Sequence, residues 1–194
     1  MAENVYDTLS EEFIESWLKA DMAEQYVQFE KELRAGDRIL DGGCGSGRDS
    51  LYFLMKGYDV DAFDPSEEMR KAASEFTGLD VEDLTWETLD RKNLYDAVWA
   101  SASLYHVSRP DMASCFKRIA ESLKSKGELF CSFRDSETDF SEDGRSFTCF
   151  TKESFLRFLS PLGLFDIIKI QERDDTRLDR KQEKWLFCFL RKRL

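Results

Sequence analysis

The chain lacks any long hydrophobic run: its longest apolar stretches, such as Trp185 to Leu190, are far shorter than the ~20 residues that a membrane-spanning helix requires. Its first residues, MAENVYDTLSEEF, are acidic where a secretory signal peptide is basic, and no apolar segment follows them. We therefore expect a soluble, cytoplasmic protein that is neither secreted nor anchored in a membrane.

Histidine and closely spaced cysteines are also scarce. The chain has one histidine, His106, and its cysteines form no Cys-x-x-Cys pair, so no zinc-ligand spacing is recognisable and we predict no metal site. In a cytoplasmic protein we expect such cysteines to be reduced thiols. They are Cys44, Cys115, Cys131, Cys149 and Cys188.

Basic side chains are in the minority, with 28 Lys and Arg against 39 Asp and Glu and a formal net charge of −11. Such a charge repels a polyanion, so we expect no nucleic-acid partner. The exception is the segment from residue 173 onward, although a run of this kind is usually a solvated face. Its basic residues are Arg173, Arg177, Arg180, Lys181, Lys184, Arg191, Lys192 and Arg193.

Proline is rare, with three in 194 residues, and neither a repeat nor a low-complexity linker marks an internal boundary. A chain of this length forms one substantial core. We predict a single domain over residues 1–194, with an N-terminal helical lid at 1–35 and a core at 36–194. Apolar residues at helical spacing between Glu11 and Glu32, including Trp17, Tyr26 and Phe29, predict one or two amphipathic helices there; core packing is the alternative to a lid.

Strands and helices alternate along the rest of the chain, and this alternation predicts an α/β fold. We expect a Rossmann-like, seven-stranded, mostly parallel sheet with helices on both faces. A polar connection without a helix precedes the last strand, which should therefore be antiparallel. The expected strands are 38–40, 58–63, 81–86, 97–100, 128–133, 165–170 and 185–190; the expected helices are 49–55, 67–75, 109–123 and 152–159, with a polar loop at 134–150.

The first expected strand runs into the glycine-rich segment Asp41-Gly42-Gly43-Cys44-Gly45-Ser46-Gly47. Its glycines let the backbone turn sharply and leave no Cβ to block a flat ligand lying across the strand end. A dinucleotide-binding turn has the pattern G-x-G-x-x-G, but here Arg48 takes the place of the third glycine. Asp64, at the end of the second expected strand, can accept hydrogen bonds from two ribose hydroxyls, or cap the next helix before Pro65. The pattern indicates a site for an adenosine cofactor.

With these residues the chain resembles the class I S-adenosylmethionine-dependent methyltransferases. The resemblance rests on the D-x-G-x-G-x-G of Asp41 to Gly47, on Asp64, and on the strand from Asp96 that leads to SASLYHV at 101–107. It implies that S-adenosylmethionine, with S-adenosylhomocysteine as product, lies with its methionine end over Gly43 to Gly47, its ribose on Asp64 and its adenine near the third strand. The cofactor-binding residues that it implies are Asp41, Gly43, Cys44, Gly45, Gly47, Arg48, Asp64, Pro65, Ser66, Met69, Trp86 and Ser101.

A narrower likeness is to bacterial small-molecule methyltransferases associated with tellurite resistance. It rests on the segment from Gly144 to Thr148 and on the segment from Asp175 to Arg180 ahead of Trp185-Leu186. One departure concerns the adenine. Relatives often place a carboxylate where this chain has Thr85, so adenine recognition is expected to rest on Trp86 or on backbone groups.

Methyl transfer from a sulfonium is an in-line displacement that mainly requires alignment and desolvation. A base helps only if the acceptor must lose a proton, and His106 is the candidate catalytic residue; the alternative is that it caps the following helix or fills a polar niche. Tyr105, His106, Arg145, Arg177 and Arg180 are the candidate acceptor-binding residues. The guanidinium groups would suit an anionic acceptor, unless they pair with neighbouring aspartates on the surface.

The prediction is a methyltransferase, monomeric or homodimeric, that acts on a small-molecule acceptor. One alternative keeps the cofactor but makes tRNA or a protein the acceptor, with the basic C-terminal segment as the contact. Another is a catalytically silent module that only binds S-adenosylmethionine. A dehydrogenase is the least favoured, because the third glycine of its motif is missing.

Overall fold

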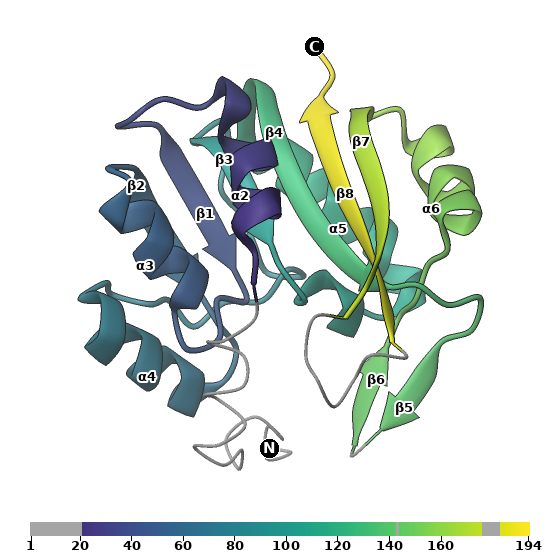
Figure 1. Cartoon of the computed structure of the whole chain (residues 1–194), viewed down its shortest axis with the longest axis horizontal. Coiled ribbons are helices and arrows are strands. Elements are labelled where there is room, and N and C mark those ends of the chain that lie inside the picture. The colour runs from purple at the N-terminus through teal and green to yellow at the C-terminus, as the bar shows by residue number, and fades with distance from the viewer. Residues whose placement is uncertain (1–20, 143, 176–182) are drawn as a thin grey trace.

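The computed structural model describes residues 21–142, 144–175 and 183–194 (Figure 1). Its central sheet has six strands in the order β2-β1-β3-β4-β8-β7. The pairs among β1 to β4 are parallel, whereas β8 runs antiparallel to both β4 and β7. The α/β class and the reversed last strand are thus confirmed. The strands are β1 (Arg38–Gly42), β2 (Asp59–Phe63), β3 (Tyr95–Ala100), β4 (Leu123–Arg134), β7 (Phe165–Asp174) and β8 (Lys184–Lys192).

The expectation of seven strands is wrong, because the segment 81–86 does not form a strand. It makes one isolated bridge, between Phe63 and Glu82, beside the outer strand β2. After this bridge the chain turns, with the backbone N–H of Thr88 donating to the carbonyl of Thr85 at 3.2 Å. A segment that turns so soon cannot continue the ladder.

The expected polar loop at 134–150 contains a small hairpin, which sequence patterning missed. Its strands β5 (Phe140–Glu142) and β6 (Arg145–Phe147) pair in an antiparallel manner. Phe140 and Phe147 are register partners, and their rings stack with centroids 4.6 Å apart. In Figure 1 the hairpin projects beyond the end of the sheet at which β1 terminates.

Helices cover both faces of the sheet, as expected. Alternate residues of each strand point to opposite faces: Ile39, Ala97 and Trp99 pack with the N-terminal helix and the helix after β1, whereas Leu40 and Val98 pack with the helices behind the sheet (Figure 1). No helix within the described ranges has the length and hydrophobicity needed to cross a bilayer. The helices are α2 (Ala23–Phe29), α3 (Arg48–Met55), α4 (Glu67–Thr77), α5 (Arg109–Ser122) and α6 (Lys152–Leu159), with short 3-10 turns η2 (Glu30–Glu32), η3 (Leu104–His106) and η4 (Ser160–Leu162).

The N-terminal helix α2 packs on the sheet through two aromatic side chains. Tyr26 and Phe29 are buried, and their ring centroids lie 5.3 Å and 4.9 Å from that of Trp99 on β3. This part of the N-terminal segment is therefore core. Trp17 and the rest of residues 1–20 lie outside the described residues, and a lid stays a prediction.

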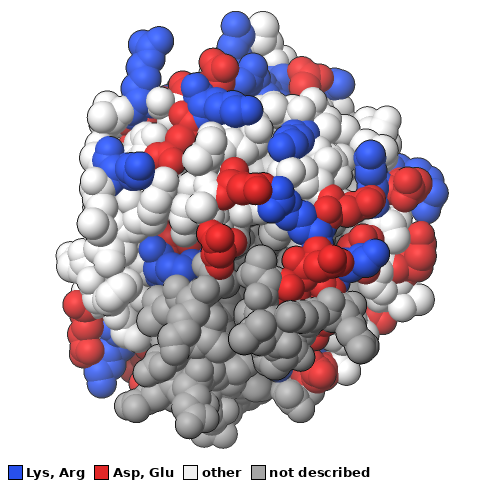
Figure 2. All heavy atoms as spheres, viewed as in Figure 1, with Lys and Arg blue, Asp and Glu red and all other residues white. Residues whose placement is uncertain are grey.

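Basic and acidic side chains are interspersed on the face seen in Figure 2. The three C-terminal arginines that the structure describes are paired with carboxylates. Arg191 contacts Glu128 at 2.6 Å, Arg193 contacts Asp166 at 2.7 Å, and Arg173 pairs with Glu24. These arginines therefore take part in ion pairs on the surface, as in the solvated face that is usual for a run of this kind.

Candidate active site

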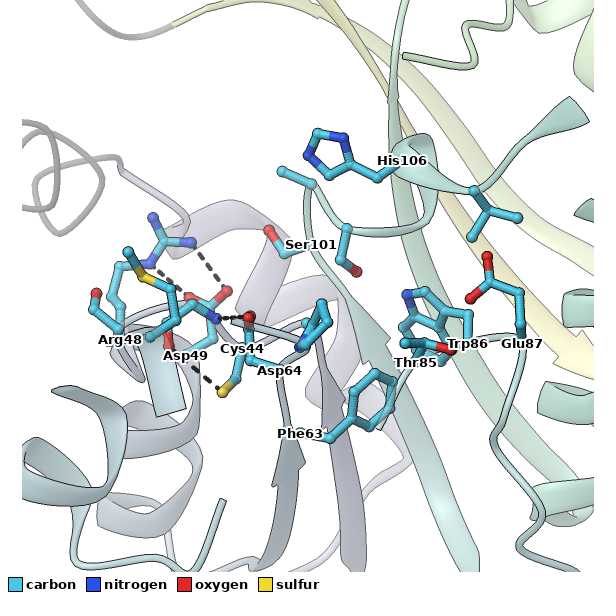
Figure 3. A pocket seen from close by; sticks show the side chains of 18 residues that line it. Cys44, Arg48, Asp49, Phe63, Asp64, Thr85, Trp86, Glu87, Ser101 and His106 are labelled. Carbon is cyan, nitrogen blue, oxygen red and sulfur yellow. Dashed lines mark hydrogen bonds and ion pairs between the residues drawn. The ribbon is translucent and has the colours of Figure 1, made fainter. Parts of the chain in front are cut away.

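A cavity of about 280 Å³ opens at the carboxyl ends of β1, β2 and β3 (Figure 3). This is the edge at which open α/β sheets bind ligands. Ten of the residues expected to bind cofactor or substrate line it together. They are Gly43, Cys44, Gly45, Arg48, Asp64, Pro65, Met69, Trp86, Ser101 and His106.

The glycine-rich loop forms the floor of this cavity with a backbone that only glycine adopts readily. Gly43 and Gly45 have φ angles of +67° and +55°, in the left-handed region. A Cβ on Gly43 would lie 2.5 Å from the Cβ of Ser103, whereas one on Gly45 would meet nothing within 4 Å. Gly43 is therefore required by its close packing against Ser103, in the turn after β3, and Gly45 leaves open space.

Asp64 joins the loop to the end of β2. Its Oδ2 accepts a hydrogen bond from the backbone N–H of Gly45 at 2.9 Å, and its Oδ1 accepts one from the N–H of Ser66 at 2.9 Å. The side chain is 8% exposed and borders the cavity. Each carboxylate oxygen has further lone-pair capacity, so Asp64 can hold the loop and still accept from a ligand.

Asp49, at the start of α3, anchors the far side of the loop. Arg48 donates to it from Nε at 2.6 Å and from Nη2 at 2.9 Å, Trp99 donates its indole N–H at 2.7 Å, and Tyr26 donates its hydroxyl. Burial alone would raise the pKa of Asp49, but the charge of Arg48 and these donors outweigh it and hold that pKa below its usual value. The guanidinium at the cavity wall is therefore fixed and paired.

The cavity wall opposite the loop carries Trp86. Its ring meets that of Phe63 edge to face at 4.9 Å, and a Cβ on Gly42 would lie 2.2 Å from it. Its indole N–H is buried and has no hydrogen-bond partner among the residues that the structure describes. Glu87 also lines the cavity (Figure 3). The sequence prediction missed this carboxylate because it treated the preceding segment as a strand.

His106 lies on the 3-10 turn η3 after β3, at the rim of the cavity (Figure 3). Its Nδ1 is 3.2 Å from the carbonyl oxygen of Ser146. Because a carbonyl only accepts, Nδ1 carries the proton and Nε2 holds the lone pair in the neutral ring. Burial lowers the pKa of His106 to about 4, and the nearby charge of Arg145 acts in the same direction.

Three of the residues expected to bind cofactor do not line the cavity. Asp41 is buried beneath the loop and accepts from the hydroxyl of Ser50 at 2.6 Å. Gly47, with φ of +88°, is the N-cap of α3, and a Cβ there would lie 2.8 Å from Thr77 of α4. Ser66 is the N-cap of α4 and accepts from the N–H of Met69. These residues shape the loop from behind.

The residues expected to bind the acceptor are only partly brought together. Tyr105 is buried against Phe147 and Trp185, and Arg145 lies over the ring of Phe147 at 5.6 Å; neither lines the cavity. Arg177 and Arg180 lie outside the described residues.

Cys44 borders the cavity as a free thiol. Burial raises the pKa of this thiol well above its usual value, so it is uncharged and a weak nucleophile at neutral pH. The cavity wall at Cys44 is small and apolar.

A family model described as a methyltransferase domain matches residues 14–188. The chain belongs to this methyltransferase family. The fold, the glycine-rich loop and Asp64 agree with the class I S-adenosylmethionine-dependent methyltransferases that the sequence resembles. The narrower tellurite-resistance group is not distinguished by this match.

Several known proteins are similar to the chain. An uncharacterised methyltransferase of Staphylococcus carnosus is 32% identical over 95 residues, 49% of this chain and 46% of the relative. A ubiquinone biosynthesis O-methyltransferase of Xanthomonas euvesicatoria is 34% identical over 118 residues, 56% of this chain and 47% of the relative. The chain thus spans about half the length of the curated relatives it matches.

Among solved structures, the 1,6-didemethyltoxoflavin-N1-methyltransferase of Burkholderia thailandensis has a TM-score of 0.79 and 21% identity. The likeness covers 98% of this chain and 88% of that one. That protein was crystallised with 1,6-didemethyltoxoflavin and S-adenosylhomocysteine. At this identity the likeness establishes the fold.

The residues around the cavity fit S-adenosylmethionine. The open space above Gly45 admits a chain lying against the loop, and the carboxylate of Asp64 can accept hydrogen bonds from a ribose. The buried N–H of Trp86, without a partner among the described residues, is a donor that a heterocycle can satisfy.

Proposed function

We propose that this chain binds S-adenosylmethionine in the cavity over the glycine-rich loop and catalyses transfer of its methyl group to a small molecule. The observation that carries the proposal is Asp64. This carboxylate borders the cavity and accepts the backbone N–H of Gly45, so one side chain shapes the cofactor loop and is positioned for the ribose. The predicted residues that line this cavity keep their assigned roles in the proposal, whereas Asp41, Gly47 and Ser66 support the loop from behind.

When bound, S-adenosylmethionine supplies an electrophilic methyl group on a positively charged sulfur. The protein's part is to hold the loop rigid, exclude water and align the acceptor. Asp49 holds Arg48 at the wall by accepting from its Nε and Nη2, and it also accepts the indole N–H of Trp99. Trp86 closes the opposite side. Neither Arg48 nor Trp86 needs to change protonation state during transfer.

His106 is the candidate for removing the acceptor's proton. Its lowered pKa makes the ring neutral at physiological pH, and the contact with Ser146 leaves the lone pair on Nε2. A base with a pKa this low is weak, so it serves an acceptor that becomes acidic as it is methylated. Acceptors that need no deprotonation would leave His106 an orienting residue.

A small-molecule acceptor is supported by the relatives' names, which include ubiquinone biosynthesis and demethylrifamycin methyltransferases. The alternative of a tRNA or protein acceptor depends on the basic C-terminal segment, whose described arginines at 173, 191 and 193 are already paired. The likeness to tellurite-resistance methyltransferases, and the monomeric or homodimeric state, stay predictions.

The experiment is calorimetric titration of the protein with S-adenosylmethionine, S-adenosylhomocysteine and NAD. We expect the first two to bind and NAD not to bind. Asp64→Asn keeps the size of the side chain but loses one acceptor oxygen and the charge, so affinity for S-adenosylhomocysteine should fall by roughly tenfold or more.

Asp59→Asn is the matched control, because Asp59 is an exposed residue at the opposite end of the same strand. The affinity of the Asp59→Asn variant for S-adenosylhomocysteine should equal that of the unmodified protein. Binding of NAD alone, or equal affinity of Asp64→Asn and the unmodified protein, would contradict the proposal. Binding of the cofactor without turnover on any small molecule would favour the silent binding module.

A further inference from the structure

A second cavity of about 130 Å³ adjoins the first. The two share Arg48, Ser101 and Ala102 in their walls. Arg48 directly follows the glycine-rich loop, so the second cavity lies beside the end of the first at which the methionine portion of the cofactor is expected. In volume it is close to the ~150 Å³ cavity that accommodates a benzene ring.

Gln25 of α2 is the most informative residue of this second cavity. The residue is 3% exposed and lines the cavity, and no hydrogen bond among the described residues uses its side-chain amide, so the amide faces the cavity space. The amide offers both donors and an acceptor to whatever occupies the cavity.

Ser132 of β4 adds a second polar group. Its Oγ accepts the backbone N–H of Ala102 at 2.8 Å, and this bond does not use the hydroxyl proton. Ser132 is 1% exposed and lines the second cavity beside Phe187. The wall therefore combines neutral hydrogen-bonding groups with aromatic surface.

The charged residues that the structure describes in this wall do not favour an anion. Arg48 is held by Asp49 at 2.6 Å, and Arg173 is paired with Glu24. Asp174 and Asp175 also border the cavity. An anionic occupant would face carboxylates, while both described arginines of the wall already have a carboxylate partner.

We propose that this second cavity holds the methyl acceptor, and that the acceptor is an uncharged compound of about one ring that both donates and accepts hydrogen bonds. The inference rests on the proposed function and names its substrate class. It differs from the anionic acceptor expected from the sequence. Of the three arginines on which that expectation rests, Arg145 borders neither cavity, and Arg177 and Arg180 lie outside the described residues. Gln25 is assigned the role of recognising the acceptor.

The test uses benzamide and benzoate, which have the same shape but differ in charge, in the presence of saturating S-adenosylhomocysteine. Their affinities are measured by ligand-observed saturation-transfer NMR. We expect benzamide to bind and benzoate to bind roughly tenfold more weakly or not at all. Gln25→Leu, which is nearly isosteric, should weaken benzamide by about three- to tenfold.

Gln28→Leu, on the same helix but hydrogen-bonded to Lys31 outside the cavity, is the matched control and should leave benzamide affinity unchanged. Ser101→Ala provides a second variant at the junction of the two cavities and should also weaken benzamide. Equal or tighter binding of benzoate, no binding of benzamide, or an unchanged affinity in Gln25→Leu would overturn the inference. S-adenosylhomocysteine should bind Gln25→Leu normally. If it fails to bind the unmodified protein, the proposed function fails as well.

Discussion

Trp99 donates its indole N–H to the carboxylate of Asp49 across 2.7 Å. Trp99 is fully buried in β3, and Asp49 lies in the first turn of the helix that follows the glycine-rich loop. This bond therefore ties the cofactor loop to the middle of the sheet. The Asp49 carboxylate can remain charged in the core because Arg48 and Tyr26 also donate hydrogen bonds to it.

Trp99→Phe should destabilise the protein by about 1.5–3 kcal/mol, because a hydrogen bond to a buried charged group is lost. The stacking on Phe130, with centroids 3.9 Å apart, should be largely retained. Urea unfolding followed by circular dichroism measures the difference. Tyr52→Phe, which removes a half-buried hydrogen bond to Glu30, serves as the control with a smaller loss. Equal losses in both variants would contradict a special role for the Asp49 network.

Gly43→Ala should be more destabilising than the same change at another left-handed glycine. Gly36 has φ of +88° with open space around its Cβ position, whereas a Cβ on Gly43 would meet Ser103 at 2.5 Å. Gly36→Ala should lose about 1–2 kcal/mol from backbone strain alone. Gly43→Ala should lose roughly 1–3 kcal/mol more from overpacking, and should weaken S-adenosylhomocysteine binding. Thermal melts and calorimetry compare the two; a similar melting temperature for both would show that Ser103 moves aside.

Periodicity predicted the strands and helices around the loop well, since each buries one regular apolar face. It failed at 81–86, where the single bridge at Glu82 and the turn at Thr85 depend on contacts with the edge of β2. It also failed at the β5-β6 hairpin, whose stacked Phe140 and Phe147 are two apolar residues in a polar segment. Pairings of this kind depend on tertiary contacts, and they leave no repeating pattern of apolar residues in the sequence.

The candidate site was predictable where one local motif fixes it, as at Gly43, Gly45 and Asp64, which the structure brings to one cavity. It was not predictable where distant segments meet. Gln25 and Ser132 carry no motif, and only the fold places them around the second cavity.

Asp41→Asn should stabilise the protein increasingly as pH rises. Burial, with the charge of Asp49, raises the pKa of Asp41 to about 8, above the ~3.9 of an unfolded Asp. The folded state therefore binds the extra proton, and stability falls as pH rises from about 4 through 8. Asparagine has no such dependence, so the unfolding free energy of the variant relative to the unmodified protein should be higher at pH 8.5 than at pH 5.

Asp96→Asn is the control for Asp41→Asn, because the pKa of Asp96 is lowered where that of Asp41 is raised. Burial acts against ionisation of Asp96, but the hydrogen bond from Lys124 and the backbone N–H of Arg38 lower its pKa overall. The stability contributed by this group is present above its unfolded pKa and is lost only as pH falls below it. The unfolding free energy that Asp96→Asn loses relative to the unmodified protein should be constant between pH 5 and pH 8.5. A constant offset for Asp41→Asn over the same interval would contradict its raised pKa.

His106 should titrate far below an ordinary histidine. Because it is the one histidine of the chain, a single imidazole signal reports on it in proton–carbon NMR spectra. Burial lowers its pKa to about 4, so the signal should not move between pH 7 and pH 5.5, where a histidine with a pKa of ~6.5 would complete most of its shift. Nitrogen shifts should show Nδ1 protonated, as the contact with Ser146 requires.

Ser146 contributes only its carbonyl to this contact, so Ser146→Ala is a suitable control and should leave the His106 titration unchanged. A lowered folded pKa also means that His106 binds its proton more readily in the unfolded state, so its contribution to stability decreases as pH falls below about 6.5. A midpoint near 6.5, or a protonated Nε2 in the neutral ring, would remove the basis for His106 as the proton acceptor in methyl transfer.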